Sequence, residues 1–490
     1  MSSSFFLKKE PKNNKKRKFE VGQFSGAGAK GKNKLKSNDP PAKKRPQIED
    51  EEIASDDEYE SGVEGDGVPN LVFSSDDADE ETPQDKRLRL AKQYLEEIEK
   101  QEADKEEEKE LHDQVSHRLQ TEYLDSVGKL RRNIAASIQS YDAENLVKLK
   151  HKKQHLPMCS LALSSDGEYL FTGAKTQFVL KWNLKTSRVE GSFDVQAHNE
   201  DANADIKRRS HVIALCLSSD FRYLALAEGG NTIQIWCPKE LKHLKTFHGH
   251  RDVVTSLVFR KDTHELYSAS RDRSVKIWSL DEMAYIETLF GHQAAITSID
   301  ALSRERAITS GGSDCTLRIW KITEESQLIY NGHHDSIENV KFINDENFIS
   351  SGVDGSLGLW TALKKKPLYT EALTHGVQSN GEPNWVTAIA CVVNTDLIAS
   401  GSCDGFIRLW QCAENNRKLK LVLKIPVEGF VNNLVFNSNG TKLFAAVGQE
   451  HKWGRWWRLP SAKNQIIVID LIRSTNSNEN KGKKYFKEFY

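Results

Sequence analysis

A tryptophan that recurs at intervals close to 40 residues is the feature that most limits how this 490-residue chain can fold. Each of these tryptophans ends a short run of β-branched or other apolar residues. The positions are Trp182, Trp236, Trp278, Trp320, Trp360 and Trp410, with intervals of 54, 42, 42, 40 and 50 residues. A period of this length is typical of a supersecondary unit that buries its apolar face only against its neighbours. The chain after residue 150 is therefore predicted to be a ring or array of similar β-units.

Three other residue types recur in step with the tryptophan. An aspartate precedes four of the tryptophans by six residues, a serine precedes each aspartate by four, and three units have a Gly-His pair about 28 residues ahead of the tryptophan. The complete sets are His250, Ser268, Asp272 and Trp278; His292, Ser310, Asp314 and Trp320; and His333, Ser350, Asp354 and Trp360. The pattern resembles the WD40 repeat, a four-stranded propeller blade. The resemblance implies that each set forms a buried hydrogen-bonded tetrad.

A hydrolase triad is the alternative interpretation of His, Asp and Ser in one unit. A triad is a single geometric constellation, whereas this set returns blade after blade, so the structural interpretation is preferred. The aspartate can accept from the histidine, which in turn fixes the serine and tryptophan. The first two units have Thr176 and Gly230 in place of the aspartate and are expected to be less rigidly held.

A seventh unit is degenerate. Its segments are residues 431–437, 442–448, 454–459 around Trp456 and Trp457, and 465–471. Leu146 to Lys150 also resembles a fourth strand, so either this segment or residues 466–471, or both, could close the ring. The predicted fold is all-β, a seven-bladed WD40 propeller over residues 145–472 followed by a charged tail at 473–490. A closed ring leaves no long free sheet edge.

The residues before the propeller divide by charge. Residues 1–47 carry fourteen Lys or Arg and three Asp or Glu, while residues 48–85 carry sixteen Asp or Glu and no Lys or Arg. Both arms are predicted to be disordered in isolation. Residues 86–140 show apolar spacings of three and four, which predict an amphipathic helical segment. The basic runs typical of a nuclear address are Lys15, Lys16, Arg17, Lys18, Lys43, Lys44 and Arg45.

Several function classes lack support. No apolar stretch approaches the roughly 20 residues of a membrane span, and the first ten residues do not have the order of a secretory signal. Seven cysteines without a Cys-x-x-Cys spacing indicate neither a disulfide framework nor a zinc site. The glycine-rich segment 26–32 has no preceding strand and no following helix, so a phosphate loop is rejected. We expect no enzyme activity, metal, cofactor or small-molecule substrate.

Cations are predicted to gather on one side of the ring. The loops between blades, and those between the second and third strand of each blade, share one face of a WD40 propeller. On this face, blades seven, one, two and three carry Lys152, Lys153, Lys175, Lys207, Arg208, Arg209, Arg251, Arg271, Arg273, Lys452 and Arg455, with Trp453 nearby. The same loops of blades four to six have almost no cations. Guanidinium groups bind phosphate and aromatic rings stack on unpaired bases, so this sector is interpreted as RNA-binding. The opposite face is mixed in charge.

Segments outside the repeat pattern resemble one particular family of WD40 proteins. They are residues 86–95, 270–278, 287–292, 301–304, 324–328, 447–451 and 454–457. Together they resemble the family of U3 small nucleolar RNA-interacting WD-repeat proteins from about residue 85 to 471. The resemblance implies a nucleolar, non-enzymatic protein that binds U3 small nucleolar RNA at its box B/C element. Implied partners are a kink-turn-binding protein, core box C/D proteins including fibrillarin, and other small-subunit processome proteins. The implied role is pre-ribosomal RNA processing and small-subunit assembly.

A protein-only scaffold, such as a chromatin reader or a ubiquitin-ligase substrate receptor, is the alternative function. Propeller faces commonly hold peptides, and a fold does not determine a function. This alternative predicts an acidic or apolar pocket for a basic tail or a short degron, and no RNA in the purified complex.

Overall fold

The computed structural model describes residues 130–143, 145–196, 211–378, 380–413 and 417–474, with short helical pieces at 89, 91–93, 116 and 118–124. The two charged arms, the basic runs, Lys207, Arg208, Arg209 and the tail after residue 474 lie outside the described residues. Predictions about them remain predictions.

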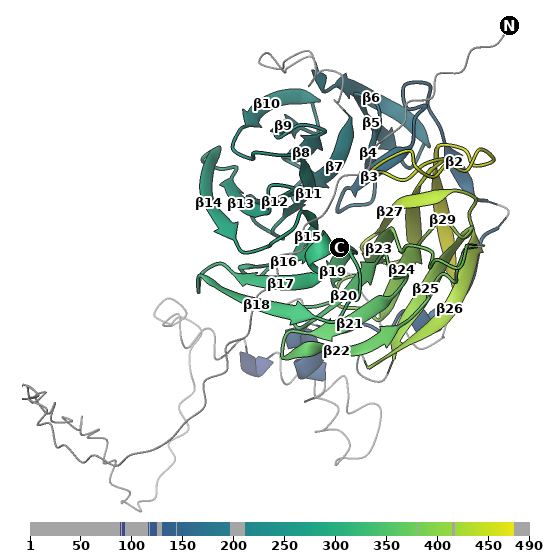
Figure 1. Cartoon of the computed structure of the whole chain (residues 1–490). Helices are drawn as coiled ribbons and strands as arrows, with labels where there is room; N and C mark the ends of the chain where they lie inside the picture. The colour runs from purple at the N-terminus through teal and green to yellow at the C-terminus, as the bar shows by residue number, and fades with distance from the viewer. Residues whose placement is uncertain are drawn as a thin grey trace, which may run out of the picture. The chain divides into compact units, whose positions relative to one another are not determined.

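Seven antiparallel sheets surround a central axis, so the structure is an all-β, seven-bladed propeller as predicted (Figure 1). Blades one to six have four strands each, which we letter a to d from the axis outward. The strands of blades one to three are β3 Met158–Leu163, β4 Tyr169–Ala174, β5 Phe178–Asn183, β6 Arg188–Asp194, β7 Val212–Leu217, β8 Leu224–Glu228, β9 Ile233–Cys237, β10 Lys242–Phe247, β11 Val254–Phe259, β12 Glu265–Ser270, β13 Ser274–Ser279 and β14 Ala284–Phe290. Those of blades four to six are β15 Ile296–Ala301, β16 Arg306–Gly311, β17 Thr316–Lys321, β18 Ser326–Asn331, β19 Ile337–Phe342, β20 Asn347–Gly352, β21 Leu357–Thr361, β22 Lys364–Glu371, β23 Ala388–Cys391, β24 Leu397–Gly401, β25 Phe406–Ala413 and β26 Lys418–Pro426.

The core lies between blades. Strands b and c read as apolar runs because both of their faces are covered, and β8 and β24 are buried along their whole length. Ile308 and Leu317 of blade four, for example, pack against Phe348 and Trp360 of blade five. No single blade covers its own apolar face, which explains why the repeat must be stacked into a ring.

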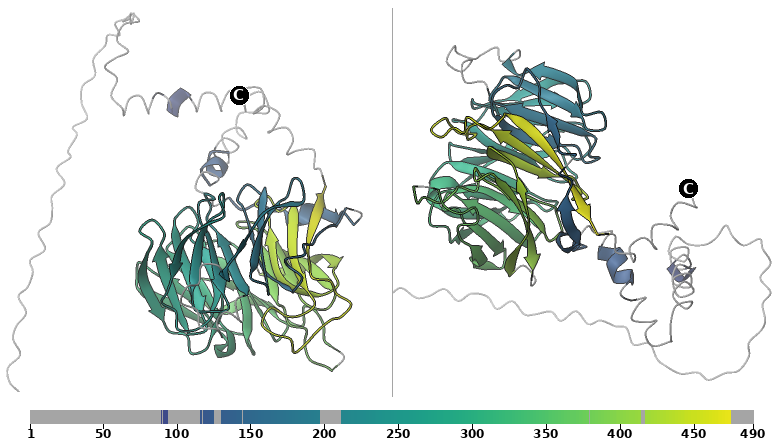
Figure 2. Two further views of the ribbon diagram at one scale, coloured as in Figure 1. Left: turned by 90° about the horizontal axis from the view of Figure 1, so that it is seen from above. Right: turned by 90° about the vertical axis from the view of Figure 1, so that its right-hand side faces the viewer.

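The seventh blade combines both ends of the propeller. Its strands are β27 Phe430–Phe436, β28 Lys442–Gly448 and β29 Gln465–Arg473, and its outer position is filled by β1 Ile138–Tyr141 and β2 Val147–Leu149. Both N-terminal strands run antiparallel to β29 (Figure 2). The predicted strand at 454–459 is wrong: residues 449–464 form a loop between β28 and β29, and β29 is the third strand. Both segments that were candidates for closing the ring, residues 146–150 and 466–471, therefore contribute to blade seven.

The end of the predicted helical segment also differs from the prediction. Residues 118–124 are helical, but Ala135–Ser137 form the 3-10 helix η1 and Ile138 begins β1, so the propeller starts before residue 145. Ala135 and Ile138 are buried in the cluster shared by blades six and seven. The backbone N–H groups of Ile134 and Ala135 donate to Asp396 at 2.6 and 2.9 Å. These tertiary contacts outweigh the helical spacing of the apolar residues.

The structure forms the polar tetrads with one correction. In blade three, His250 contacts Asp272 and Ser268 at 2.9 and 2.8 Å, and the Trp278 indole donates to Ser268 at 2.9 Å. His333, Ser350, Asp354 and Trp360 make the same set of contacts in blade five, at 2.6 to 3.4 Å.

In blade four, Thr309 rather than Ser310 is the hydroxyl partner of His292 and Trp320, at 2.7 and 2.8 Å. The turn of blade four contains the short 3-10 helix η3 Gly312–Asp314, so the hydroxyl that faces His292 stands one residue earlier relative to Asp314. Ser310 instead contacts the Thr297 hydroxyl at 2.8 Å. His292 and Asp314 lie 2.7 Å apart as predicted.

Blade six contains a tetrad histidine that the sequence pattern missed. His375 lies 3.0 Å from Asp404 and 2.8 Å from Ser400, and Trp410 donates to Ser400 at 2.8 Å. Blades one and two substitute amides for the histidine network. Trp182 donates to Thr172, which donates to Gln154, and Trp236 donates to Gln234.

Candidate nucleic-acid interface

The cations of blade three are positioned by its tetrad aspartate. The Asp272 carboxylate accepts from the backbone N–H of Arg251 at 3.0 Å and from the N–H and hydroxyl of Ser274 at 2.9 and 2.6 Å. Burial opposes ionisation of Asp272, but the hydrogen bonds from His250 and Ser274 outweigh it and hold its pKa well below the usual range. The charged carboxylate thus ties the loop that carries Arg251 to the turn that carries Arg271 and Arg273. All three arginines are exposed.

Trp453 connects three blades across the mouth of the central channel. It belongs to the 449–464 loop of blade seven, and the Arg271 guanidinium of blade three lies 4.7 Å from its ring centroid. The Lys452 ammonium lies 5.5 Å from the same ring. Glu338 of blade five is buried near Trp453, Lys452 and Arg271, and burial raises its pKa. Lys452 faces the channel, a cavity of about 140 Å³, where burial lowers its pKa against the opposing charge of Glu338.

Glu450 organises a second group of predicted cations. The Arg455 Nε donates to this carboxylate at 3.1 Å, and the Lys175 ammonium lies 3.6 Å from it. Lys175 also donates to the backbone carbonyl of His451 at 2.7 Å. Burial, with the charges of Lys452 and Lys175, lowers the pKa of His451 to about 3. Arg455 remains 69% exposed, whereas Lys175 is 13% exposed.

Blade one contributes two exposed lysines. Lys153 donates to the Ser192 hydroxyl at 2.7 Å and lies 5.2 Å from the Phe178 ring centroid. Lys152 lies beside it and is exposed.

The predicted sector is thus divided into two kinds of cation. Arg251, Arg273 and Lys152 are exposed, and Arg455 is exposed although its Nε donates to Glu450. Lys175 lies beside Glu450 and Lys452 faces the central channel, so both are less accessible to a ligand. Sequence reasoning missed Glu338 and Glu450, because Glu338 lies more than 100 residues from Lys452 in the chain. It also gave no weight to Trp456, which is 58% exposed and lies 6.2 Å from Trp385 between ring centroids. An exposed indole held in this way can stack on an unpaired base.

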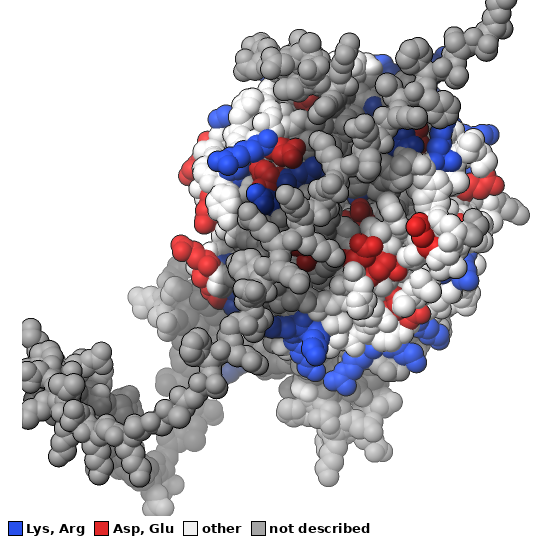
Figure 3. Space-filling view, in the orientation of Figure 1, with Lys and Arg blue, Asp and Glu red and all other residues white. Residues whose placement is uncertain are grey.

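Charge is unevenly distributed on the face drawn in Figure 3. Lys and Arg side chains gather over blades two and three, where some Asp and Glu also lie, whereas Asp and Glu gather over the region of β23 and β24. Lys and Arg side chains also lie along the edge near β22, so the low number of cations in the loops of blades four to six remains a prediction.

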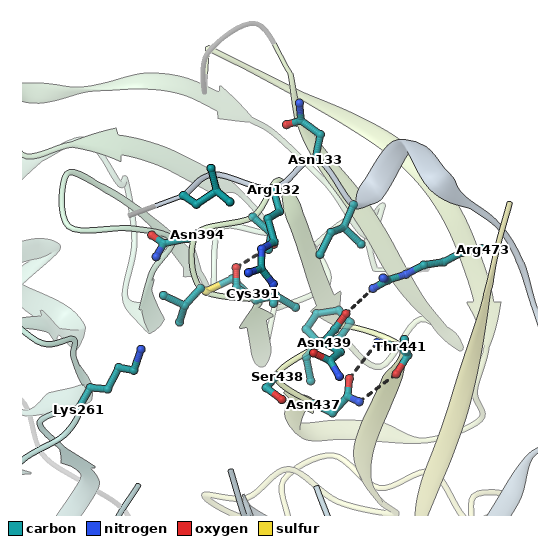
Figure 4. A pocket seen from close by; sticks show the side chains of 16 residues that line it. Arg132, Asn133, Lys261, Cys391, Asn394, Asn437, Ser438, Asn439, Thr441 and Arg473 are labelled. Carbon is teal, nitrogen blue, oxygen red and sulfur yellow. Dashed lines mark hydrogen bonds between the residues drawn. The ribbon is translucent and has the colours of Figure 1, made fainter. Parts of the chain in front are cut away.

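The opposite face contains a large pocket whose lining is both polar and apolar. It has a volume of about 920 Å³ and lies between residues 130–134 and the first turns of blades six and seven, with Lys261 reaching it from blade three (Figure 4). Two other cations of this face are paired: Arg260 lies 3.2 Å from Glu265, and Arg304 lies 2.9 Å from Asp345.

Within the described part of the chain, no three His, Cys, Asp or Glu side chains are grouped to hold a metal ion. All seven cysteines are free, and burial raises the pKa of the Cys159 and Cys412 thiols to about 12. The helices that the structure describes are too short or too polar to cross a bilayer.

Comparison with known proteins places the chain in a family. Residues 241–279, 283–321, 324–361 and 375–411 match the model of the WD domain, G-beta repeat. Mouse U3 small nucleolar RNA-interacting protein 2 is 49% identical over 400 residues, covering 80% of this chain and 83% of the mouse protein. The chain belongs to this family. The human U3 small nucleolar RNA-interacting protein 2 is 47% identical over the same shares of both chains.

More distant and structural comparisons agree with this family assignment. The Arabidopsis thaliana U3 snoRNP-associated protein-like EMB2271 is 32% identical and covers 93% of this chain and 99% of its own length. The crystal structure of RRP9 WD40 repeats is 42% identical with a TM-score of 0.65, covering 68% of this chain and 100% of that structure.

Proposed function

We propose that this protein is a WD40 component of the U3 small nucleolar ribonucleoprotein and binds U3 small nucleolar RNA. The observation that carries the proposal is the 49% identity to a U3 small nucleolar RNA-interacting protein across 80% of the chain. The cationic sector over blades seven, one, two and three supports it independently.

The sector supplies two kinds of contact. Arg251, Arg273, Arg455, Lys152 and Lys153 bind the phosphate backbone, and Arg guanidinium can do so bidentately. Arg271 lies over the Trp453 ring and Lys452 lies beside it, so Arg271 and Trp453 offer one surface on which a base can stack. Lys175 positions the 449–464 loop through Glu450. Arg208 and Arg209, which precede β7 in the sequence, are further candidates for phosphate contacts.

Membership of the family supports a more detailed proposal for the RNA element, the partners and the process. We infer recognition of the box B/C element beside a kink-turn-binding protein, together with core box C/D proteins including fibrillarin. The particle acts with other small-subunit processome proteins in pre-ribosomal RNA processing, in the nucleolus, and the basic runs at 15–18 and 43–45 serve as the nuclear address. The protein's own role is non-catalytic.

Charge reversal at two exposed arginines tests the proposal. Arg251→Glu with Arg273→Glu is expected to weaken binding of box B/C RNA by more than tenfold in a filter or fluorescence assay. It should also lower the salt slope of log Kd by about two, one for each lost phosphate contact. Lys239→Glu with Lys242→Glu, at exposed positions on or near the c–d turn of blade two, is the matched control for net charge. Unchanged RNA binding by the folded arginine variant would refute the assignment of this surface.

One observation favours a second candidate, a scaffold that binds a basic or apolar peptide. Leu373, Val377 and Phe406, in blades five and six, are 49%, 54% and 40% exposed. Purification of the native complex separates the two candidates, because a protein-only scaffold would carry no U3 RNA.

A further inference from the structure

The pocket on the face opposite the cationic sector, which we call the basal pocket, is built from segments distant in sequence. One wall is residues 130–134, which precede the propeller, and two others are the turns 391–395 of blade six and 436–441 of blade seven. Lys261 of blade three and Arg473 at the end of β29 complete it. In Figure 4 the Lys261 and Arg132 side chains extend into the space between these walls.

The walls are held in place by hydrogen bonds. The Arg132 backbone N–H donates to the Asn394 carbonyl at 2.9 Å, and Asp396 accepts from the backbone N–H groups of Ile134 and Ala135. On the other side, Asn437 accepts from the Thr441 N–H at 2.8 Å, and Arg473 donates to the Asn439 carbonyl. A pocket with walls fixed in this way is preformed, which lowers the entropic cost of binding.

Three cations line the pocket. They are Arg132, Lys261 and Arg473, and among the described lining residues there is no Asp or Glu. The neighbouring carboxylate of Asp396 is turned toward the backbone of residues 134 and 135 and toward Gln411, at 2.9 Å. Lys261 is exposed, and its ammonium has no ion-pair partner among the described residues. The described lining thus offers cations to an anion that enters this space.

The uncharged lining narrows the class of ligand. Amide and hydroxyl groups lie on the same walls as the cations. They belong to Asn133, Asn394, Asn437, Ser438 and Asn439. Amide and hydroxyl groups both donate and accept hydrogen bonds, whereas a bare phosphate only accepts. A nucleotide combines phosphate with ribose hydroxyls and a base edge that donates and accepts. The volume of about 920 Å³ lies within the range of sites that enclose ligands larger than a single ion.

We propose that the basal pocket binds an unpaired segment of RNA, with its phosphates against Arg132, Lys261 and Arg473 and its base and ribose edges against the asparagines. The proposal rests on the proposed function for the presence of RNA, but it concerns a second site on the other face. A protein with both sites holds one RNA strand on each face of the ring.

Crosslinking of the full chain tests the pocket. A single-stranded oligonucleotide containing 4-thiouridine is irradiated with the protein, and the crosslinked peptides are identified by mass spectrometry. We expect crosslinks to residues 391–395 or 436–441. Lys261→Glu with Ser438→Glu, both at exposed positions, should reduce them at least fivefold while leaving box B/C RNA affinity within twofold. Lys239→Glu with Lys242→Glu should change neither quantity.

The arginine variant of blade three separates this proposal from the proposed function. Arg251→Glu with Arg273→Glu should weaken box B/C binding and leave the basal crosslinks intact. Crosslinks confined to other surfaces, or basal crosslinks unaffected by the Lys261 and Ser438 changes, would overturn the pocket proposal. A phosphopeptide that binds the pocket while the oligonucleotide does not would also overturn it. Loss of U3 binding specificity with retained basal crosslinks would instead contradict the proposed function alone.

Discussion

At the scale of single residues, blade four shows that the hydroxyl of a buried tetrad can come from the neighbouring position in the sequence. Ser310 has the same spacing to Asp314 as the tetrad serines of blades three and five, yet Thr309 carries the network. The Asp314 pKa is lowered by the hydrogen bond from His292 despite burial, so Asp314 is ionised and His292 Nδ1 donates to it. His292 Nε2 is then an acceptor for the Thr309 hydroxyl, which accepts in turn from Trp320.

Thr309→Val is expected to destabilise the propeller more than Ser310→Ala. The valine removes both hydrogen bonds and leaves two buried nitrogen groups unsatisfied, at a cost of about 1–3 kcal/mol. Ser310→Ala should cost less, about 1 kcal/mol or below, because Thr297 keeps its 2.7 Å hydrogen bond to the Ile337 carbonyl. Urea unfolding of the two variants measures the difference, and the reverse order would contradict the assignment of Thr309.

His451 is expected to make stability depend on pH. Its pKa is lowered to about 3 in the folded protein, mainly by burial. In the unfolded chain the pKa is about 6.5, so between these values the unfolded state binds the extra proton and stability falls as pH decreases. From pH 7 to pH 5 this group alone should remove about 2 kcal/mol.

The test compares His451→Asn with the unchanged protein by urea unfolding at both pH values. His292 and His375 also have lowered pKa values, but they are present in both proteins. The difference in stability loss between the two proteins therefore reports on His451 alone. Equal losses in the two proteins would show that folding does not lower the pKa of His451.

At the scale of elements, the repeated strands could be predicted from sequence because each blade repeats the same apolar run before its tryptophan. His375 could not, since it follows Thr374 instead of a glycine and stands 35 residues before Trp410. The strand at Ile138 was also missed, because apolar spacings of three and four predict a helix when only local sequence is considered. Its partner β29 is more than 320 residues away. The candidate cations were visible as a set, but the carboxylates beside them were not, because Glu450 lies in the 449–464 loop and Glu338 lies in β19, far from Lys175 and Lys452 in the sequence.

Ile138→Ala is expected to destabilise the propeller by about 2–4 kcal/mol, because Ile138 is 5% exposed within the cluster of blades six and seven. Val147→Ala, at a 38% exposed position of β2, is the matched control and should cost about 0.5 kcal/mol or less. Thermal unfolding followed by circular dichroism measures both. Similar small changes in both variants would place β1 outside the cooperative unit.

At the scale of the whole molecule, charge is separated along the chain as well as across the ring. Residues 1–47 have a large excess of Lys and Arg, and residues 48–85 contain only acidic charge. A basic arm attracts RNA at long range, and this attraction is screened by salt.

Deletion of residues 1–47 is expected to slow RNA association at low salt without changing the melting temperature of the propeller. The effect on association rate should be about tenfold at 50 mM salt and small above 300 mM, since screening removes the long-range term. Stopped-flow fluorescence gives the rates, and calorimetry gives the melting temperature. A deletion that leaves the rate unchanged at low salt would show that the arm does not steer RNA.

The pairing of β1 and β2 with β29 has a consequence for biosynthesis. Leu149 and Ile466 are opposite each other in this pairing, so nearly the whole propeller must be translated before the last blade can be completed. Until then β1 and β2 have no strand to pair with, although the residues of six blades have already been synthesised. A chain that terminates before residue 465 would keep most of its blades and still be left as an open arc.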